Sequence, residues 1–569
     1  MKILHAGPLN VLYENGFLRM IRYGGNEIVR MIYFALRDHN WNTISHRIEN
    51  ERIETHSDRF QVAYDCLNVD EGAVIIAWKA KIEGRSDGSI IFEIAGEVNA
   101  PFRRNRAGFC VLHPLLTLGE ECKITHSDGT ATVKAFPADV AADNPFVDIE
   151  RMQWTSSGIS YTLAFEGDLF ETEDQRNWGD ASFKTFCTPL TRPFPVGLRK
   201  GDRIIQRITF APDVQLSPLN EQDSDIIFRD AGHRSRLPVF GIAQSTESPH
   251  LTDKAASLLR NLRLQHYRID LSPSSENFAT EFSNAYENAF RAGVALEVAL
   301  HLTDNVDEET EAFTVICQQN KVRLSKVVLL PANGLVTAQA AIDRIPQMKE
   351  IFQRVLFGAG TNYNFNEINK NRFIASDVDF ITFSMDPQEH AFDNRTILEN
   401  SASPEYLVRS AKSIYGSDMP VHISPLTLRK RFNPYATNPA DLYIEEEAKA
   451  DPRMKEPFAA LWTLASVCSA AKGGASAITF FQTAGNQGIL SLNDKPYPVY
   501  DLLKSLSPYQ GKAVTVLESR DTMVTGILLD GKLLAMCNLS HDGKRVRWNE
   551  DVFELEPGQI RFEPLHRPK

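Results

Sequence analysis

Apolar and polar residues alternate along short runs through the first 230 positions of the chain. The clearest runs are rich in Val, Ile, Phe, Tyr and Thr, and they span 17–25, 59–69, 88–98 and 159–167. Alternation is typical of a half-buried β-strand, because successive side chains of a strand point to opposite faces. Helical periodicity is nearly absent, so this part is predicted to be a large antiparallel β-sandwich of roughly 15 strands.

The pattern changes near residue 231, where short apolar runs begin to alternate with helical stretches such as 252–262 and 454–472. Eight apolar runs follow, at 238–243, 264–271, 295–302, 326–332, 354–360, 379–385, 419–425 and 477–483. The first six begin 25–31 residues apart, which is the length of one β/α unit. Eight such units predict a TIM barrel. A doubly wound open sheet is the alternative, and the lack of a GxGxxG motif after the first run weighs against it.

Alternating runs return after about residue 500, at 512–520, 523–540 and 546–558. The second run contains Asp530 and Gly531, a dipeptide that favours a hairpin turn. The sequence therefore predicts three domains, namely an N-terminal β-sandwich over 1–232, a TIM barrel over 233–503 and a small C-terminal β-domain over 504–569.

The bulk composition is that of an ordinary globular protein. The chain has 569 residues, of which 43% are hydrophobic and 24% charged, and its formal net charge is −12. This length exceeds what one hydrophobic core can organise, in agreement with several domains. An acidic balance argues against nucleic acid as a partner, since nucleic-acid binders present a basic face.

No targeting segment or membrane span is predicted. The chain reaches Pro8 and Asn10 before any apolar core of signal-peptide length, and its longest apolar runs, such as 73–78, are of strand length. The seven cysteines form no CxxC pair and no zinc-ligand spacing. Cysteines without such motifs favour reduced, buried thiols in a cytoplasmic protein that has no structural metal. Without a predicted span, no membrane partner is expected either.

Catalytic side chains of a TIM barrel lie at the carboxyl ends of its strands. The fifth predicted strand ends in 360-GTNYNFNEINKNR-372, which carries Asn366, Glu367, Asn369 and Arg372. A carboxylate beside an amide suits acid–base catalysis, because the amide can orient a substrate hydroxyl next to the proton-transfer group. A capped βα loop, in which Asn and Glu are common, is the alternative.

The sixth predicted strand ends in 384-SMDPQEHAFDN-394, where His390 lies near Asp386, Glu389 and Asp393. A histidine that a carboxylate holds in one tautomer works as a general base near neutral pH. Glu367 and His390 are therefore the candidate catalytic residues, and a solvent-exposed loop with a lone histidine is the alternative for the second of them.

Other strand ends supply candidate substrate ligands. Arg268 on the second strand can hold a carboxylate or a sugar hydroxyl, or it can form a buried ion pair with Asp270. His301 ends the third strand, and Gln482 lies at the end of the eighth. The end of the seventh strand offers Ser424, Thr427, Arg429 and Arg431, although a surface basic patch is the favoured explanation of the two arginines.

The stretch 171-ETEDQRNWGDASFKTF-186 combines Arg176 and Trp178 with several other charged residues late in the predicted sandwich. Aromatic faces and bidentate guanidinium groups suit a polyhydroxylated, acidic or lactone substrate. We therefore expect Arg176 and Trp178 to cover the barrel mouth and to bind substrate. A contact between domains that the same residues make is the alternative.

Over nearly its whole length the chain resembles the D-apionate lactonases, enzymes of apiose catabolism in bacteria. The resemblance rests on 21-IRYGGNEIVRMIYFALRDHNWNTI-44, 173-EDQRNWGDASFKTFCTPL-190, 360-GTNYNFNEINKNR-372, 385-MDPQEHAFDN-394 and 477-AITFFQTAG-485. It implies an N-terminal β-domain, a central TIM barrel and a C-terminal β-domain. It further implies a hydrolase that opens a branched-sugar lactone, of the D-apionolactone type, to the free acid without a metal or an organic cofactor.

The resemblance also carries over to single residues. Glu367, Asn369 and Arg372 match a Glu-x-Asn-x-x-Arg pattern, and His390 and Asp393 match His-Ala-Phe-Asp.

Two positions depart from the family pattern. Asn362 stands where an acidic residue often follows the Gly-Thr of the fifth strand, and Gln482 stands where a Glu often lies on the eighth. If that Glu is catalytic in relatives, the departure implies a changed substrate or a lost activity.

A lactone hydrolase needs a general base, an oxyanion donor and an acid for the leaving alkoxide. Glu367 or His390 is the expected base, with the other as the acid, and Arg372 or Gln482 is the expected oxyanion donor. The one GxSxG string, 84-GRSDG-88, lies among the predicted strands of the sandwich and not at a strand-to-helix turn, so it is no nucleophile elbow, and no GxxxxGK[ST] phosphate loop is present in the sequence.

Two other functions remain open. A retaining glycosidase would need a second carboxylate near Glu367, for which Asp386, Glu389 and Asp393 are available. A non-catalytic carbohydrate-binding protein is favoured by Gln482 in place of an acid. The expected partner is a small sugar lactone or saccharide, and the sequence predicts no oligomeric state.

Overall fold

The computed structural model describes residues 1–217, 225–320, 322–436 and 439–565. Its contacts divide the chain into two compact units. The first unit comprises Met1–Gln175, Ala181–Ser224 and Tyr435–Leu442, and the second comprises Arg176–Asp180, Asp225–Pro434 and Tyr443–Lys569. The short segment Arg176–Asp180 therefore belongs to the second unit, although the chain on both sides of it belongs to the first.

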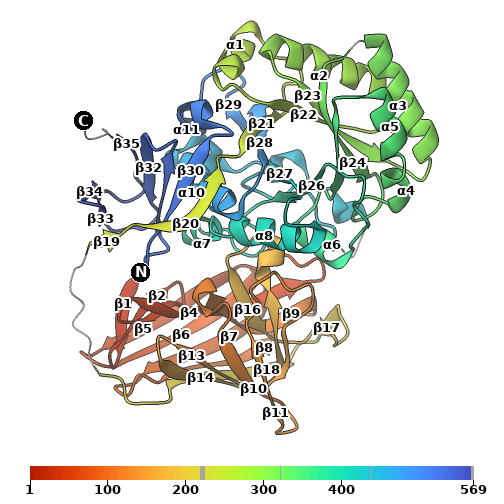
Figure 1. The fold of residues 1–569 in the computed structure, drawn as a ribbon. Helices are drawn as coiled ribbons and strands as arrows, with labels where there is room; N and C mark the ends of the chain where they lie inside the picture. Colours follow the sequence, from red (N-terminus) through yellow and green to blue (C-terminus); the bar gives the residue numbers. More distant parts are fainter. Residues whose placement is uncertain (218–224, 321, 437–438, 566–569) are drawn as a thin grey trace. The chain divides into compact units, whose positions relative to one another are not determined.

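The first unit consists of two nine-stranded antiparallel sheets (Figure 1). The order in one sheet is β1 (Lys2–Ala6), β2 (Leu9–Glu14), β3 (Phe17–Tyr23), β4 (Asn26–Asp38), β9 (Phe102–Pro114), β16 (Ser182–Phe186), β15 (Phe170–Asp174) and β12 (Phe146–Ile149), with β17 (Val196–Leu198) beside β9. The order in the other is β11 (Ala131–Ala135), β10 (Glu121–Thr125), β13 (Arg151–Ser156), β14 (Ile159–Glu166), β18 (Arg203–Pro212), β8 (Ile90–Val98), β7 (Ala73–Gly84), β6 (Phe60–Asp70) and β5 (His46–Thr55).

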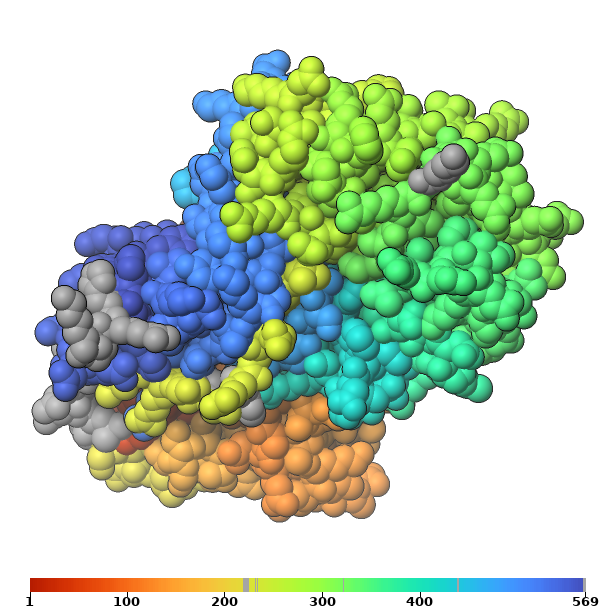
Figure 2. Space-filling model, turned by 45° about the horizontal axis from the view of Figure 1, so that its top comes forward, coloured from red at the N-terminus to blue at the C-terminus, as the bar shows by residue number. Residues whose placement is uncertain are grey.

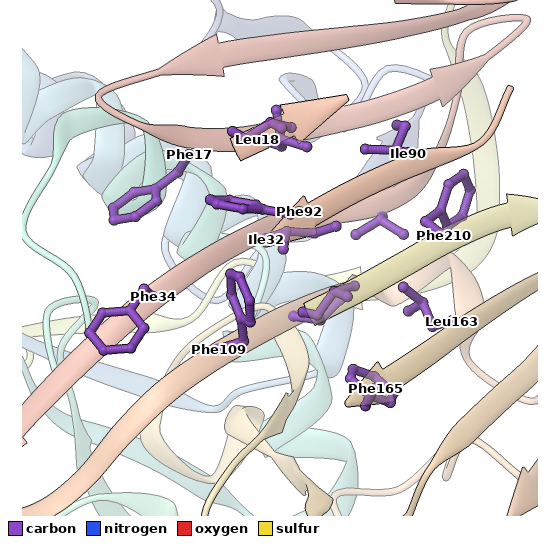
Figure 3. Packing of buried hydrophobic residues seen from close by; sticks show 14 of the residues in the cluster. Phe17, Leu18, Ile32, Phe34, Ile90, Phe92, Phe109, Leu163, Phe165 and Phe210 are labelled. Carbon is purple, nitrogen blue, oxygen red and sulfur yellow. The ribbon is translucent and has the colours of Figure 1, made fainter. Parts of the chain in front are cut away.

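The hydrophobic core of this unit lies between the two sheets. Strand β6 shows the alternation that builds it, since Phe60, Val62 and Tyr64 are buried while the residues between them are exposed. Phe92 of one sheet and Phe109 of the other meet edge to face, with ring centres 4.8 Å apart (Figure 3). Aromatic and β-branched side chains from both inner faces thus fill one interior, and the predicted β-sandwich is confirmed.

The second unit contains a closed parallel barrel. Its eight strands follow one another as β21 (Val239–Ala243), β22 (His266–Leu271), β23 (Leu296–Leu302), β24 (Leu324–Pro331), β25 (Leu356–Gly360), β26 (Phe380–Met385), β27 (Val421–Leu426) and β28 (Ala477–Ala484). Strand β28 pairs with β21 and closes the ring, which excludes a doubly wound open sheet. Each strand lies on one of the eight predicted apolar runs, so the TIM barrel is confirmed. Strand β29 (Gly488–Leu490) adds to β28 outside the ring.

Helices connect the strands around the outside of the barrel (Figure 1). They are α1 (Asp253–Asn261), α2 (Phe278–Ala292), α3 (Val306–Asn320), α4 (Gln339–Ile342), α5 (Ile345–Ile351), α6 (Phe365–Lys370), α7 (Asn394–Asn400), α8 (Pro404–Tyr415) and α10 (Pro457–Gly473). Two further helices are α9 (Glu446–Lys449), in the long connection after β27, and α11 (Pro498–Leu506), which follows β29. In Figure 2 the residues of the first half of the barrel, coloured yellow-green to green, form one continuous surface, as expected where helices cover a strand layer.

Ionisable side chains fill part of the barrel interior. The Lys326 ammonium donates to Nδ1 of His266 at 3.1 Å and to Glu297 at 3.2 Å, and His266 Nε2 lies 2.8 Å from the hydroxyl of Thr479. Burial lowers the pKa of His266 to about 3, so this imidazole is neutral at neutral pH. These hydrogen bonds satisfy polar and charged side chains that would be costly to bury unpaired. The side chains occupy the barrel interior beneath its mouth.

Strands after the barrel, together with two strands that precede it, form two small sheets. One contains β20 (Arg229–Arg236), β30 (Ala513–Glu518), β31 (Val524–Leu529), β32 (Leu533–Asn538) and β35 (Ile560–Pro564), and the other contains β19 (Ile226–Ile227), β33 (Lys544–Trp548) and β34 (Asp551–Leu555). Asp530 and Gly531, at φ 52° and 64°, turn β31 into β32 as predicted. Helix α10 is apolar on all sides and buried, and it contacts α8, α11 and β31. The three-domain boundaries drawn from the sequence stay a prediction.

All seven cysteines are buried and unpaired, as expected. Within the described part of the chain, no helix is both long enough and apolar enough to span a membrane. The same residues contain no cluster of three or more His, Cys, Asp or Glu side chains with the geometry of a metal site.

Candidate functional site

A cavity of about 360 Å³ opens at the carboxyl ends of the barrel strands. The ends of β21, β22, β23 and β28 contribute Ala243, Asp270, His301 and Gln482 to its wall. The chain after β25 and β27 adds Asn362, Tyr363, Thr427 and Arg431, and the segment 443–454 adds Tyr443, Glu446, Lys449 and Asp451. This position and size are those of the active sites and ligand sites of TIM barrels.

Strand β22 positions two of the polar groups in this wall. His266, Arg268 and Asp270 are two residues apart, so all three point to the same side of the strand. The side chains of His266 and Arg268 are almost completely buried, whereas the Asp270 side chain is 33% exposed. One strand therefore presents neutral, cationic and anionic groups at successive levels, from the barrel interior to its mouth.

Asp270 accepts hydrogen bonds from three surrounding side chains. Arg268 donates to both carboxylate oxygens, at 2.9 and 3.2 Å. His301 Nε2 lies 2.9 Å and Asn362 Nδ2 lies 3.1 Å from Oδ1. Burial of the carboxyl works against its ionisation, but the Arg268 charge and the His301 hydrogen bond outweigh it and hold the pKa of Asp270 well below its usual range. Asp270 is therefore a carboxylate at neutral pH.

His301 lines the cavity, and Asp270 fixes one of its two ring nitrogens. Because an ionised carboxylate only accepts hydrogen bonds, Nε2 carries the proton that is shared with Asp270. Nδ1 is then the basic nitrogen, and no described residue donates a hydrogen bond to it. The side chain is 20% exposed, so Nδ1 can reach a bound water or substrate. This is the arrangement of a general base with its orienting carboxylate.

Asn362 joins two cationic groups to the carboxylate. Its Oδ1 accepts from Nη2 of Arg268 at 2.9 Å and also from Nη2 of Arg431, while its Nδ2 donates to Asp270. Guanidinium groups only donate and a carboxylate only accepts, so the orientation of the amide is determined. An acidic side chain at this position would place a second negative charge beside Asp270.

Arg431 retains hydrogen-bonding capacity toward the cavity. Its Nη2 donates to the backbone oxygen of Asn362 at 3.2 Å and to the Oδ1 of the same residue, while no described residue accepts from Nη1 or Nε. Burial, reinforced by Arg268 and opposed by Asp270, lowers the pKa of Arg431 to about 10. The guanidinium is still charged at neutral pH, and it can bind an oxyanion or a carboxylate.

Gln482 faces the same cavity from β28. The backbone N–H of Thr246 donates to its Oε1 at 3.0 Å, which fixes the amide oxygen and leaves Nε2 as a donor. Phe481 precedes it at φ 34°, a conformation that is strained for a bulky residue, and the register of β28 with β21 shifts at this point. The irregular backbone thereby turns the Gln482 side chain into the cavity wall.

Three residues that the sequence suggested as substrate ligands, Arg268, His301 and Gln482, thus line the cavity. Glu367 and His390, the expected acid–base pair, are absent from its wall. Glu367 lies on α6 with no exposed surface, and Asn366 Nδ2 lies 3.2 Å from its Oε1.

The remaining candidates surround the segment Arg176–Asp180, which also lies outside the cavity wall. His390 Nδ1 is 2.6 Å from Asp180 Oδ2, and Asn369 Nδ2 donates to Asn177 Oδ1 at 2.9 Å. The Trp178 ring is edge-on to the His390 ring at 6.3 Å. This segment therefore does contact α6 and the loop after β26, through side-chain hydrogen bonds that anchor it to the second unit.

Three further candidates have identifiable contacts near this cluster. The Arg176 side chain is fully buried, with its guanidinium 5.4 Å from the centre of the Tyr406 ring. Asp393 is the N-cap of α7 and accepts from Thr396 N at 3.0 Å. Arg372 is exposed, and its Nε donates to the backbone oxygen of Asn369 at 3.3 Å.

Arg431 lies in the cavity wall and not in the surface patch that the basic run 429–431 suggested. Sequence patterns did not single out Asp270, Glu446 or Lys449 as site residues. Asp270 could have been found from its spacing, because it follows Arg268 by two positions at the carboxyl end of a barrel strand. No comparable signal marks Glu446 and Lys449, which lie on a four-residue helix far beyond the end of β27.

Comparison with known proteins agrees with this architecture. Residues 1–215 match the model of the D-apionate lactonase N-terminal domain, and residues 240–511 match that of the D-apionate lactonase TIM barrel domain. A D-apionate lactonase from Brucella anthropi is 28% identical over 535 residues, which cover 90% of this chain and 88% of that protein.

Glycoside hydrolases are among the solved structures that align with this chain. A family 30 subfamily 8 xylanase from Clostridium acetobutylicum is 10% identical, with a TM-score of 0.38, over 57% of this chain and 88% of that chain. A family 39 glycoside hydrolase from Bacteroides cellulosilyticus is 11% identical, with a TM-score of 0.38, over 81% of this chain and 96% of that chain.

The two lactonase domain models follow each other in order and together cover most of the chain, on either side of the point where the sandwich gives way to the barrel. The chain belongs to the D-apionate lactonase family.

Proposed function

We propose that this protein hydrolyses a sugar-acid lactone of the D-apionolactone type to the free hydroxy acid, and that the reaction takes place in the cavity at the barrel mouth. The observation that carries the assignment is the Asp270–His301 pair, which lines the same cavity as Arg431. The name of the Brucella anthropi relative, D-apionate lactonase, supports the substrate class.

In the proposed first step, His301 activates a water molecule. Nδ1 takes a proton from the water while the water oxygen attacks the lactone carbonyl carbon. The imidazolium that forms is stabilised by Asp270, which also keeps Nε2 protonated throughout. Proton transfer by a positioned base of this kind typically accelerates a reaction by about 10²–10⁴-fold.

The attack creates a tetrahedral intermediate with a negative oxygen. Arg431 Nη1 and Gln482 Nε2 are donors on the cavity wall that no described residue occupies, and we assign the oxyanion to them. When the intermediate collapses, the bond from the carbonyl carbon to the ring oxygen breaks, and the proton on Nδ1 of His301 passes to the leaving alkoxide. The product is a hydroxy carboxylic acid, which releases its carboxyl proton to solvent at neutral pH, and Arg431 can hold the carboxylate that results.

Glycoside hydrolysis is less well supported by the carboxylates of this cavity. A glycosidase needs a carboxylic acid that stays protonated near neutral pH, which requires a raised pKa. Asp270, Glu446 and Asp451 line the cavity, and cationic partners, Arg268, Lys449 and Arg453 in turn, lower the pKa of each below its ordinary value although burial acts in the opposite direction. All three are therefore carboxylates rather than acids.

The direct test is acid release by the purified protein from a panel of sugar lactones, D-apionolactone included, beside a panel of aryl glycosides. We expect hydrolysis of a lactone and loss of that activity in His301→Asn. The variants Glu367→Gln and His390→Asn belong in the same assay, because the sequence predicts them as the acid–base pair.

The outcomes of these assays distinguish catalysis by His301 from catalysis by Glu367 and His390, from glycoside hydrolysis and from binding without turnover. If His301→Asn retains full activity while Glu367→Gln or His390→Asn loses kcat and remains folded, the assignment to His301 fails and the prediction from the sequence stands. Cleavage of a glycoside without any lactone hydrolysis would overturn the proposed reaction. Ligand binding without turnover on either panel would indicate a carbohydrate-binding protein.

A further inference from the structure

We infer that Glu446 and Lys449 bind two adjacent hydroxyl groups of the substrate and so select a hydroxylated lactone over an unsubstituted one. This inference rests on the proposed lactone hydrolysis and specifies how that site recognises its substrate. Both residues lie on the short helix α9, and both line the cavity that contains His301 and Arg431.

Lys449 provides donors that the protein does not use. Its ammonium donates to Glu446 Oε1 at 2.6 Å and lies 5.9 Å from the centre of the Phe432 ring. An ammonium has three N–H donors, and the described residues offer no other acceptor for it. The side chain is only 15% exposed and lines the cavity, so a ligand bound there can reach its remaining donors.

Glu446 provides an acceptor whose orientation is fixed. Its Oε2 accepts from Thr246 Oγ1 and from Gln487 Nε2, each at 3.1 Å, and its Oε1 accepts from Lys449. An ionised carboxylate has about four acceptor positions, so one remains for a ligand. The two neutral donors come from loops that follow β21 and β28, and they hold the carboxylate at the rim of the cavity.

Thr246 connects this pair to the proposed reaction centre. Its Oγ1 reaches Glu446, and its backbone N–H donates to Gln482 Oε1, which orients the amide donor that we assign to the oxyanion. A substrate held by Glu446 and Lys449 is thereby bound on the same wall of the cavity as Gln482.

The chemistry of the pair matches a vicinal diol. A hydroxyl group both donates and accepts, so one hydroxyl can accept from Lys449 while its neighbour donates to Glu446. An unsubstituted lactone has no hydroxyl groups. It would leave the Lys449 ammonium and the Glu446 carboxylate without hydrogen-bond partners beside an apolar ligand, which costs binding free energy. Recognition by charged partners also explains why the two residues lie in the cavity wall and not on the outer surface of the barrel.

The test compares two lactones with the same five-membered ring. Erythronolactone carries two adjacent hydroxyls, and γ-butyrolactone carries none. The variants are Glu446→Gln, Lys449→Met and the conservative Lys449→Arg, with Glu447→Gln as the matched control, since Glu447 is an exposed neighbour outside the cavity wall. Circular dichroism and thermal unfolding verify that each variant is folded.

We expect Lys449→Met and Glu446→Gln to lower kcat/KM for erythronolactone by about 10- to 100-fold, mainly through KM, because each removes a hydrogen bond to a charged group. Activity on γ-butyrolactone should stay within about twofold, Lys449→Arg should recover part of the loss, and Glu447→Gln should resemble the wild type. Equal effects on both lactones, or none on either, would overturn the inference while leaving the lactonase intact. Failure of the wild type to hydrolyse any lactone would instead overturn the proposed function, and this inference with it.

Discussion

Nε2 of His301 lies 2.9 Å from Oδ1 of Asp270, and the two residues come from neighbouring barrel strands. The carboxylate is itself fixed by two hydrogen bonds from Arg268, so the imidazole is held against a rigid partner. A histidine placed in this way has one defined tautomer, and its side chain lines the cavity.

Asp270→Asn should impair both activity and stability. The amide cannot fix the His301 tautomer as a carboxylate does, so we expect kcat to fall by about 10²–10⁴-fold. Arg268 would also lose its counter-ion in the barrel interior. Removing one partner of a buried ion pair typically costs about 3–5 kcal/mol, and we expect the lower part of that range because the Asp270 side chain is 33% exposed. Lactone assays and urea unfolding measure the two effects, and a fully active, fully stable Asp270→Asn would contradict both.

Arg431→Met should remove an oxyanion donor. We expect kcat to fall by about 10²–10³-fold with a smaller change in KM, because such a donor acts mainly in the transition state. Lys430→Met is the matched control, since Lys430 is the adjacent cation, lies outside the cavity wall and is 3.7 Å from Glu389. If the two variants lose activity equally, the effect is one of general charge and not of the Arg431 guanidinium.

Gly179→Ala should disturb the anchoring of the segment Arg176–Asp180. Gly179 has φ 90°, and a Cβ atom added to it would lie 2.5 Å from the backbone oxygen of Asp386. Gly201 has a similar φ of 92° but open space around its Cβ position, so Gly201→Ala reports the backbone strain alone. We expect Gly179→Ala to lower stability by about 1–3 kcal/mol more than Gly201→Ala, in the range of overpacking. Equal losses in thermal unfolding would show that the contact with Asp386 is readily relieved.

His113 should make unfolding consume a proton at mildly acidic pH. Burial lowers the pKa of this histidine to about 3 from its ordinary 6.5. The unfolded chain therefore binds a proton that the folded chain excludes, so the contribution of His113 to stability is complete above pH 6.5 and declines as the pH falls toward 3. The slope is about 1.4 kcal/mol per pH unit.

The measurement is proton uptake during urea unfolding at pH 5, compared between the wild type and His113→Gln. The difference should be about one proton. His266 behaves in the same direction and remains in both proteins, so uptake in the variant should not disappear. Equal uptake by the two proteins would mean that His113 is already protonated in the folded state.

Local sequence pattern was sufficient for the architecture. Alternating apolar positions such as Phe60, Val62 and Tyr64 predicted the sandwich, and the regularly spaced apolar runs predicted each of the eight barrel strands. These features depend on which face of a strand or helix avoids water, and neighbouring residues determine that face. The turn at Asp530 and Gly531 is equally local, since both residues readily adopt positive φ.

The composition of the cavity depended on tertiary structure. His301 and Asp270 are 31 positions apart, and Glu446 meets Thr246 across 200 positions. The density of polar residues drew attention to Glu367 and His390, yet the chain directs them toward Asn366 and Asp180 and not into the cavity. Sequence identifies the strand end on which a side chain lies. Only the closed barrel determines which ends meet and which side chains face the cavity, because that depends on the strand register, on the bulge at Phe481 and on how the chain beyond β27 returns to the mouth.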